Sequence, residues 1–430
     1  MKKLYPVLTA LAASLCAQAA ILTTVGSTDM RESKVWVKFD SVPKNPTAKI
    51  FETKSPEKKS DGKFVRIGGD YNPEIYAAVF EDLAPNTEYG FEIADGESVS
   101  TGTVKTSPDY KNRTPPPDFA FVALGENHIN DRRFDEPFKE PGGEYEIYET
   151  IRKTAPAFAI WAGSTNAYRH ADIGSRSGML SRQLELRALP EARGLLNAQP
   201  NYGALGTNAL QDASSRGAKN HAAVFETIWC NPQPAEGSSH AYTFSYADAD
   251  FFVLDDFSNR SNLDYKQTRP QMLGQPQLDW LFTALQNSKA TFKFVVMNTP
   301  ATNPVESADN FTFAKDERKR LLAFLSDKKI GGIVFISGRK GYGEITRHIR
   351  AGSYPIYEIT AGPTTARPNK EISEMNYFRV PSSATLARSF AQVKIEGAEG
   401  ARTLTMTFIN AKGDALFSTT IKQSDLQKFE

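Results

Sequence analysis

The chain has 430 residues, of which 40% are hydrophobic and 23% are charged, so it is long enough to bury the cores of two or three globular domains. Its 51 basic and 50 acidic residues give a net charge of +1, which excludes a global field that would attract nucleic acid or an anionic membrane surface.

The first 19 residues have the layout of a secretory signal peptide. A Lys-Lys pair precedes an apolar stretch over residues 4–16, and a small-residue Ala-Gln-Ala sequence follows before Ala20. The apolar stretch is shorter than the roughly 20 residues that a transmembrane helix needs, so we expect no membrane span. The segment predicts a mature chain that begins at Ala20 and is secreted or periplasmic, or associated with the cell surface.

Removal of this segment would leave Cys230 as the single cysteine, so we expect no internal disulfide. A lone thiol beside Trp229 is more often a buried small hydrophobic residue than a nucleophile, and we favour the first interpretation.

Residues 20–107 alternate apolar and polar residues between Pro, Gly and Asn turns, which is typical of an all-β domain. Residues 83–89 (Leu-Ala-Pro-Asn-Thr-Glu-Tyr) resemble the turn of fibronectin type III domains in which a tyrosine packs back on the sandwich. Residues 108–117 contain four prolines and no apolar periodicity, which indicates a stiff linker. We therefore expect a fibronectin-III-like sandwich that folds separately from the rest of the chain.

Residues 118–430 alternate apolar runs with amphipathic helical patterns, which is typical of an α/β domain. Each run is closed by glycine or a small polar residue, as expected for a buried strand that ends in a loop. Ligands of open α/β sheets bind outside the carboxyl ends of the strands, so the candidate site lies there. The expected strands are residues 119–124, a run closed by Gly163, and residues 202–205, 251–254, 292–297 and 332–336. The expected helices are residues 143–154, 177–189, 275–288 and 316–328. Residues 354–430 return to strand patterns, which favours two packed sheets with outer helices.

Six segments of this second domain carry a family resemblance. They are residues 174–180, 250–256, 273–281, 288–293, 334–338 and 357–363. Together with the N-terminal β domain they resemble the alkaline-phosphatase-D-like, or PhoD-like, family of metallophosphatases over nearly the whole mature chain. The resemblance implies a metallophosphatase-type α/β sandwich over residues 118–430. It also implies hydrolysis of phosphate esters with a dinuclear metal centre, such as iron with calcium.

The metal ligands that the resemblance implies at the strand ends are missing from this chain. After the first strand the family's Gly-Ser-Cys is replaced by Gly-Glu-Asn, and after the second its Gly-Asp-Asn is replaced by Gly-Ser-Thr. The family's Trp-Asp-Asp-His-Asp is replaced by Leu-Gly-Thr-Asn-Ala, and its Ser-Gly-Asp-x-His by Ser-Gly-Arg-Lys-Gly. Because amides and hydroxyls bind metal weakly and a guanidinium repels it, we expect no metal cofactor. The degenerate positions are Glu126, Asn127, Ser164, Thr165, Thr207, Asn208, Arg339 and Gly341.

Two carboxylates remain at a strand end, Asp255 and Asp256, and Glu126 and His128 follow another strand. These four residues are the candidate residual metal site. The favoured alternative is that the two aspartates cap the neighbouring helix or pair with an arginine, either Arg339 or Arg260. The five histidines, His128, His170, His221, His240 and His348, follow no ligand spacing, so we interpret each as a surface or satisfied core residue.

Arg339 and Lys340 bring positive charge to the place where the family has metal ions. A guanidinium fork suits carboxylate or phosphate, so this pair is a candidate anion-binding site. The favoured alternative is that Arg339 pairs with Asp255 or Asp256 as an internal salt bridge.

We therefore expect a secreted protein with the metallophosphatase fold that has lost its dinuclear centre and acts by binding or in a structural role. The alternative is a phosphoesterase, for monoesters or diesters, with a rebuilt metal site. A third possibility is an adhesive module that uses the β domain. The sequence identifies no partner; an anionic ligand and a cell-surface protein are the candidates, and nucleic acid is not expected.

Overall fold

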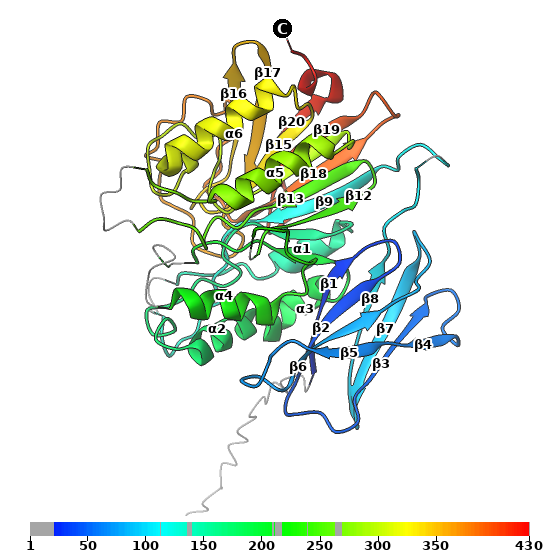
Figure 1. Cartoon of the computed structure of the whole chain (residues 1–430). Helices are drawn as coiled ribbons and strands as arrows, with labels where there is room; N and C mark the ends of the chain where they lie inside the picture. Colours follow the sequence, from blue (N-terminus) through cyan, green and yellow to red (C-terminus); the bar gives the residue numbers. More distant parts are fainter. Residues whose placement is uncertain are drawn as a thin grey trace, which may run out of the picture.

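The computed structural model describes residues 21–111, 113–135, 140–208, 210, 217–238, 240–262 and 269–429, and Figure 1 shows the whole chain. The predicted signal peptide, residues 1–19, lies outside the described residues. A β-sandwich comes first in the chain and a larger α/β domain follows it. No helix among the described residues combines the length and the apolar character that crossing a bilayer requires.

The N-terminal domain is a sandwich of two four-stranded sheets, which confirms the predicted all-β fold. Its strands are β1 (Ile21–Thr28), β2 (Ser33–Phe39), β3 (Thr47–Glu52), β4 (Lys59–Asp61), β5 (Lys63–Arg66), β6 (Ile75–Phe80), β7 (Glu88–Asp95) and β8 (Ser98–Lys105). One sheet has the order β1-β2-β6-β5 and the other β4-β3-β7-β8. The main-chain N–H of Ala84 donates to the hydroxyl of Tyr89 at 2.8 Å, which is the bond expected of the fibronectin-like turn.

The second domain contains two six-stranded sheets packed face to face, as predicted. Its strands are β9 (Phe119–Leu124), β10 (Ala159–Trp161), β11 (Asn201–Gly203), β12 (Tyr242–Tyr246), β13 (Ala249–Val253), β14 (Phe292–Val296), β15 (Ile333–Ser337), β16 (Glu344–Arg350), β17 (Ser353–Thr360), β18 (Ser389–Glu396), β19 (Thr403–Asn410) and β20 (Ala415–Lys422). The sheets have the orders β11-β10-β9-β18-β19-β20 and β12-β13-β14-β15-β17-β16. Phe121 of the first sheet contacts Phe251 and Phe294 of the second at ring-centroid distances of 5.1 Å.

Helices cover the outer faces of the two sheets. They are α1 (Ile147–Lys153), α2 (Arg176–Ala188), α3 (Pro190–Leu196), α4 (Ala218–Ile228), α5 (Gln275–Asn287) and α6 (Lys315–Asp327), with 3₁₀ turns η1 (Phe311–Ala314) and η2 (Gln423–Leu426). Figure 1 shows α5 and α6 side by side on the second sheet, and α2, α3 and α4 on the side of the first sheet. The four predicted helices correspond to α1, α2, α5 and α6, whereas α3, α4, β12 and β16 were not predicted.

The parallel strands place the candidate site. Strands β9, β10 and β11 are parallel in the first sheet, and β13, β14, β15 and β17 are parallel in the second. Because parallel neighbours end at the same edge, the loops after β9, β10 and β11 emerge together, and so do those after β13, β14 and β15.

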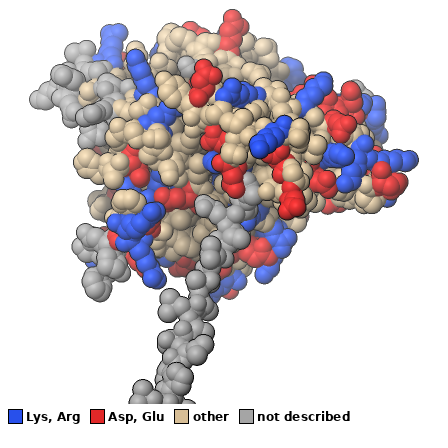
Figure 2. Space-filling model, turned by 90° about the horizontal axis from the view of Figure 1, so that it is seen from below, with Lys and Arg blue, Asp and Glu red and all other residues tan. Residues whose placement is uncertain are grey.

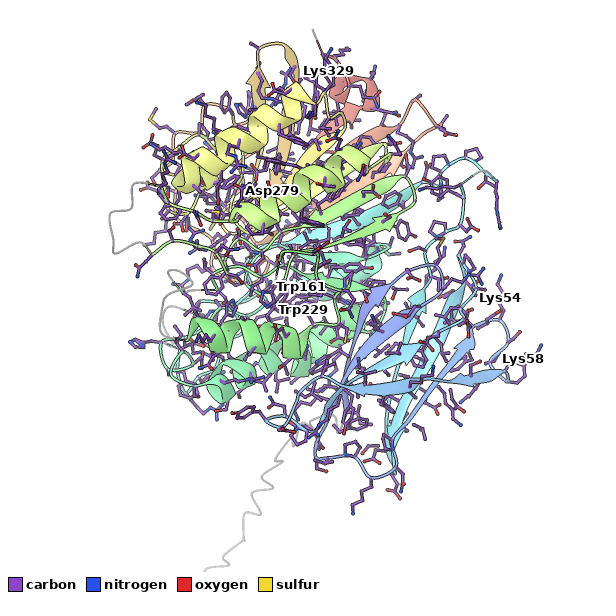
Figure 3. The ribbon with its side chains drawn as sticks, viewed as in Figure 1. Lys54, Lys58, Trp161, Trp229, Asp279 and Lys329 are labelled. Carbon is purple, nitrogen blue, oxygen red and sulfur yellow. The ribbon has the colours of Figure 1, made fainter. Side chains whose placement is uncertain are left out.

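The two domains share a hydrophobic core. In β2, Val35 and Val37 face the sandwich interior, whereas Trp36, which is 1% exposed, packs with side chains of the second domain. The indole Nε1 of Trp36 donates to the carbonyl oxygen of Thr227 at 2.8 Å. Figure 3 shows Trp229 beside Trp161, and their rings are 6.0 Å apart between the centroids. Apolar packing thus continues from β2 through the first sheet of the α/β domain.

Charges are mixed on the surface. Figure 2 shows one face on which basic and acidic side chains are interspersed, and neither sign forms a continuous patch there. That distribution agrees with the net charge of +1 and offers no polyanion-binding surface on this face.

Candidate functional site

The loops that follow parallel strands of both sheets meet at one place. A Cβ on Gly163, after β10, would lie 2.4 Å from the carbonyl carbon of Gly125, after β9. A Cβ on Gly338, after β15, would lie 2.7 Å from the carbonyl carbon of Ala162. Only glycine permits such close backbone contact. The strand ends named from the sequence therefore form one region where the two sheets abut.

Asn127, after β9, is fully buried and bonded at both ends of its amide. Its Nδ2 donates to the carbonyl oxygens of Gly125 at 2.9 Å and Ser164 at 3.2 Å. Its Oδ1 accepts from the hydroxyl of Tyr148 at 2.7 Å. Ser164 and Thr165, after β10, are buried beside it. The amide at this degenerate position therefore ties two strand-end loops together.

The loop after β11 is held by a histidine and an asparagine. Asn208 has a left-handed backbone (φ 41°), and its Oδ1 accepts from the main-chain N–H of Tyr168 at 3.3 Å. The ring of His221 on α4 lies 3.0 Å from the hydroxyl of Tyr168 and 2.7 Å from the carbonyl oxygen of Gly206. Burial lowers the pKa of His221 to about 4, so the ring is neutral near pH 7. Thr207 is buried, and its hydroxyl has no partner among the described residues.

Asn298, after β14, links the loops at the ends of the two sheets. With its amide oriented to satisfy both neighbours, it donates to the carbonyl oxygen of Ala162 at 3.1 Å and accepts from the N–H of Gly206 at 3.2 Å. A cavity of about 20 Å³ remains, lined among others by Ser164, Asn208 and Asn298. A single water needs about 10–15 Å³, so this cavity holds one water and nothing larger.

Glu126 and His128, two of the four candidate residual ligands, face different partners. The carboxylate of Glu126 makes no hydrogen bond or ion pair among the described residues. Burial raises its pKa, and the charges of Arg339 and Lys340 oppose that rise. His128 lies 3.3 Å from the carboxylate of Asp135, and burial lowers the pKa of His128 to about 4.

Asp255, the third candidate, is occupied by a turn and by a histidine. Its Oδ1 accepts from the main-chain N–H groups of Phe257 at 3.1 Å and Ser258 at 2.8 Å. Its Oδ2 lies 3.0 Å from Nδ1 of His240, whose Nε2 lies 3.1 Å from Glu226. Burial disfavours both charges, but the contact between them outweighs it, lowering the pKa of Asp255 and raising that of His240. Asp255 therefore caps a turn rather than the predicted helix, and its charged partner is a histidine rather than an arginine.

Asp256, the fourth candidate, is completely buried after β13. Its Oδ2 accepts from the main-chain N–H of Thr299 at 2.7 Å, and its Oδ1 has no hydrogen-bond partner among the described residues. Burial raises its pKa, and the charge of Arg260 acts in the opposite direction. The carboxylate thus anchors the loop after β14.

The predicted salt bridge between Arg339 and the aspartates after β13 is wrong. Arg339 pairs with Asp309 at 2.8 Å, and the two side chains are 21% and 54% exposed. Lys340 is buried and pairs with Glu374 at 2.6 Å. A Cβ on Gly341 would lie 2.1 Å from Oδ1 of Asn369, in the loop after β17. An anion at this predicted site would therefore compete with Asp309 for Arg339 and with Glu374 for Lys340.

Two buried glutamates near the site were not identified as candidates from the sequence. Glu358 of β17 accepts from the main-chain N–H groups of Ala301 at 2.8 Å and Thr302 at 2.7 Å. Glu344 of β16 pairs with Arg379 at 2.6 Å. For Glu358, a charged residue inside a mostly apolar strand was the available signal, because such a residue is buried only when its hydrogen bonds are satisfied. Both carboxylates hold loops in place.

These donors do not fit a dinuclear metal centre. Within the part of the chain that the structure describes, no group of three His, Cys, Asp or Glu side chains could hold a metal ion. A two-metal site needs such ligands around ions that lie about 3.5–4 Å apart. His170 and His348 do not supply such ligands. His170 is exposed, and His348 packs on Phe378 with ring centroids 4.5 Å apart.

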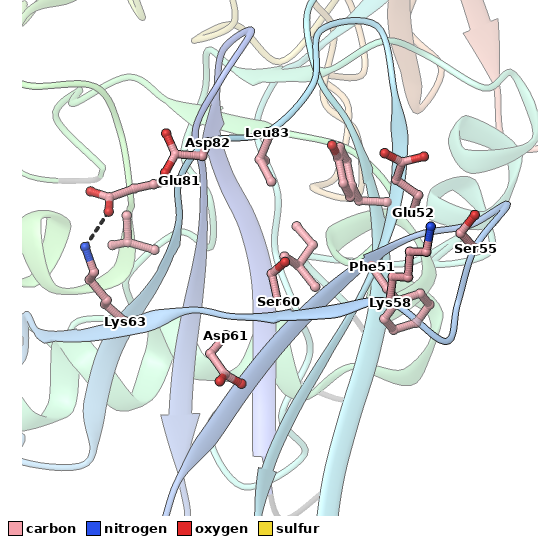
Figure 4. Close-up of a pocket in the computed structure, with 13 residues that line it drawn as sticks. Phe51, Glu52, Ser55, Lys58, Ser60, Asp61, Lys63, Glu81, Asp82 and Leu83 are labelled. Carbon is pink, nitrogen blue, oxygen red and sulfur yellow. Dashed lines mark hydrogen bonds and ion pairs between the residues drawn. The ribbon is translucent and has the colours of Figure 1, made fainter.

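A separate cavity of about 490 Å³ lies in the N-terminal sandwich (Figure 4). Its wall combines apolar residues with Glu52, Lys58 and Asp61, and the Lys63 ammonium pairs with Glu81 across one end. This is a surface that an adhesive β domain could use, but both charge signs line it, so the lining favours no class of ligand.

Comparison with known proteins gives a family and two similar folds. A family model described as PhoD-like phosphatase matches residues 197–407. A solved structure of PhoD is similar to this chain with a TM-score of 0.72 at 14% identity, covering 95% of this chain and 91% of the other. A purple acid phosphatase from yellow lupin (Lupinus luteus) seeds gives a TM-score of 0.70 at 12% identity, covering 94% of this chain and 74% of the other. No curated protein matches the chain. At such identities the two structures show a shared fold and do not carry over an activity.

Proposed function

We propose that this chain, whose residues 197–407 match the PhoD-like phosphatase family model, is a member of that family without phosphatase activity. We propose further that it is exported and acts by binding, or in a structural role, in the periplasm or at the cell surface. The signal-peptide layout of residues 1–19 supports the export.

The observation that carries the proposal is that the strand-end side chains bond other parts of the chain and supply no group of three metal ligands among the described residues. Metal-assisted hydrolysis requires ions that ionise a water and clamp the phosphate oxygens, with room for both ions and substrate. Here the amides of Asn127 and Asn298 join neighbouring loops, and the cavity that the described residues Ser164, Asn208 and Asn298 line is about 20 Å³. That space is far below the roughly 300 Å³ at which small-molecule pockets begin.

The alternative, a phosphoesterase with a rebuilt site, needs Glu126, His128, Asp255 and Asp256 to act together. Three of them have other partners: His128 bonds Asp135, Asp255 bonds His240, and Asp256 anchors the loop after β14. Glu126 is the one carboxylate of the four without a hydrogen bond among the described residues. Any residual activity should therefore depend on Glu126.

The test measures turnover of aryl phosphate monoesters and diesters by the mature protein, with iron, calcium, zinc or manganese added. A PhoD-like enzyme with intact ligands serves as the positive control, and metal content is measured on the same preparation. We expect no turnover above the buffer rate and no stoichiometric metal. Turnover that Glu126→Gln abolishes, while the exposed-site control Glu57→Gln retains it, would overturn the proposal.

A further inference from the structure

A groove of about 370 Å³ separates the outer edge of β12 from the turn between β1 and β2. It lies between the two domains, where ligand sites are preferentially found. In Figure 1, β12 is the strand of its sheet that lies nearest the N-terminal sandwich. The sandwich side contributes Thr28, Asp29 and Met30, and the α/β side contributes Thr243, Phe244 and Ser245.

The backbone of β12 has unpaired groups along this groove. Strands β12 and β13 form a hairpin in which Tyr246 pairs with Ala249, joined by a two-residue turn. In such a hairpin the two residues that flank the turn form main-chain hydrogen bonds with each other. Every second residue counted back from Tyr246 along β12 therefore points its N–H and C=O away from β13. Thr243 and Ser245 are the outward residues. Neither makes a main-chain hydrogen bond to another segment of the described chain.

The chain segment that passes this edge cannot pair with it. Pro232 borders the groove, and Pro234 lies two residues further on. Proline has no N–H to donate, so this segment does not extend the ladder. Among the described residues, the main-chain N–H of Ala235 in this segment donates to the carbonyl oxygen of Ala241 at 2.7 Å, one residue before β12 begins. The edge beyond that point stays available for another strand.

The opposite wall is fixed in place. The main-chain N–H of Ser27 donates to the carbonyl oxygen of Cys230 at 2.7 Å. The hydroxyl of Tyr202 bonds the N–H and the carbonyl oxygen of Thr28, at 3.3 Å and 3.2 Å. Because these bonds join the two domains, the groove is preformed and needs no domain movement to open. A preformed groove lowers the ordering cost of binding.

The charge on this wall indicates a cationic side chain in the occupant. Oδ1 of Asp29 accepts from the N–H groups of Arg31 and Glu32. The carboxylate makes no ion pair among the described residues, whereas Glu32 and Lys34 pair with each other at 3.1 Å. The net charge of the three groove residues Asp29, Glu32 and Lys34 is therefore negative. A lysine or arginine opposite Asp29 would complement it.

We propose that the outer edge of β12 docks an extended segment of another protein, which adds to the sheet as a strand and places a lysine or arginine against Asp29. Main-chain bonds to Thr243 and Ser245 provide the affinity, and alternate side chains of the segment enter the groove. This surface lies apart from the strand-end region, so the proposal does not depend on the loss of phosphatase activity.

The probe is a synthetic peptide of alternating valine and threonine with one central lysine, and it is compared with the same peptide N-methylated along its pairing edge. Hydrogen exchange of the amides of Thr243 and Ser245 is followed by NMR in the mature protein. At a peptide concentration twice its Kd we expect exchange at both sites to slow about threefold, because occupancy reduces the free fraction by 1 + [L]/Kd. The N-methylated peptide should leave the exchange unchanged.

Asp29→Asn keeps the side-chain oxygen that caps the turn and removes the charge. It should weaken the lysine peptide several-fold and leave a peptide with alanine in place of lysine unaffected, whereas the control Asp61→Asn, on the exposed strand β4, should change neither. Equal binding of the N-methylated peptide, or no slowing at Thr243 and Ser245 with the peptide in excess, would overturn the proposal. Protection of the same amides by concentration-dependent dimerisation without peptide would also overturn it, since the occupant would then be a second copy of the chain.

Discussion

Trp36 joins the two domains, and its replacement tests whether they fold as one unit. The ring is 1% exposed, and its Nε1 donates to the carbonyl oxygen of Thr227. The buried guanidinium of Arg187 lies between Trp36 and Trp229, 4.9 Å and 5.0 Å from the ring centroids. Truncation to alanine would therefore remove an aromatic anchor, a hydrogen bond and one side of a cation–π stack.

The expected cost can be estimated from these contacts. A buried tryptophan removes about 150–250 Å² from water, which at about 25 cal/mol per Å² gives roughly 4–6 kcal/mol. Measured replacements of buried Phe or Trp by alanine cost about 3–5 kcal/mol, cavity included. The loss of one cation–π face adds about 0.5–2 kcal/mol, and relaxation around the cavity offsets part of the total. We expect Trp36→Ala to lower the free energy of unfolding by about 4 kcal/mol, a large share of the roughly 5–15 kcal/mol of a typical protein.

Differential scanning calorimetry with urea denaturation distinguishes the two possibilities. If the shared core couples the domains, the wild type unfolds in one transition and Trp36→Ala shifts the whole of it. The control Trp280→Ala, on α5 and only partly buried, should cost less. Two separate transitions in the wild type, with Trp36→Ala moving only one of them, would refute this reasoning and support the separate folding that the proline-rich linker predicted.

The remaining predictions concern single groups. Arg339→Ala should lower stability by less than about 1 kcal/mol in urea titrations, because its pair with Asp309 is partly exposed; a loss above about 2 kcal/mol would mean that the pair is internal. Because burial lowers the pKa of His221 to about 4, its contribution to stability is complete above pH about 6.5 and is lost as the pH falls toward 4. His221→Gln should flatten that part of the melting-temperature profile, and an unchanged slope would contradict the assignment. The intact mass of exported protein should match a chain that begins at Ala20, and a mass that includes residues 1–19 would contradict cleavage.

The strands and helices of the α/β domain were predictable where a strand is buried on both faces or a helix is buried along one face. Apart from Lys293 and Ser337, the runs at β9, β14 and β15 are apolar because both faces are largely buried, and α5 and α6 carry apolar stripes. Strand β12 was missed because exposed Thr243 and Ser245 alternate with Tyr242, Phe244 and Tyr246 over only five residues. An edge strand of this length gives a weak periodic signal.

The packing contact between the two domains could not be predicted from the linker. Alternation in β2 indicates which residues face the sandwich interior, but it does not show that the other face is also covered. Trp36 stands on that other face between Lys34 and Lys38, a pattern typical of a solvated surface. The protein covers it with α4 and the first sheet, a contact between residues about 190 positions apart. Only the packing of the complete chain determines that contact.

At the candidate site, the sequence indicated which residues stand at the strand ends but not which loop returns to them. Arg339 and the aspartates after β13 follow strands of the same sheet, so a pairing between them was reasonable. The segment after β14 instead brings Asp309 to Arg339 and places the N–H of Thr299 on Asp256. Irregular segments of this kind have no periodicity from which their path could be predicted.

Hydrogen bonds from side chains to the main chain hold the strand-end loops together. Metal ions would join these loops through charged ligands, and removing only the ions would leave buried carboxylates that repel one another. Here three of the linking groups are neutral: the amides of Asn127 and Asn298 and the ring of His221 bond main-chain atoms of adjacent loops. Each such hydrogen bond contributes about 1 kcal/mol to the stability of the fold. Leaving its buried donor or acceptor without a partner would cost about 1–3 kcal/mol. If the chain has lost a metal site, as we propose, a single acidic residue introduced beside Asn208 would place an unpaired charge at a cavity of about 20 Å³ rather than recreate that site.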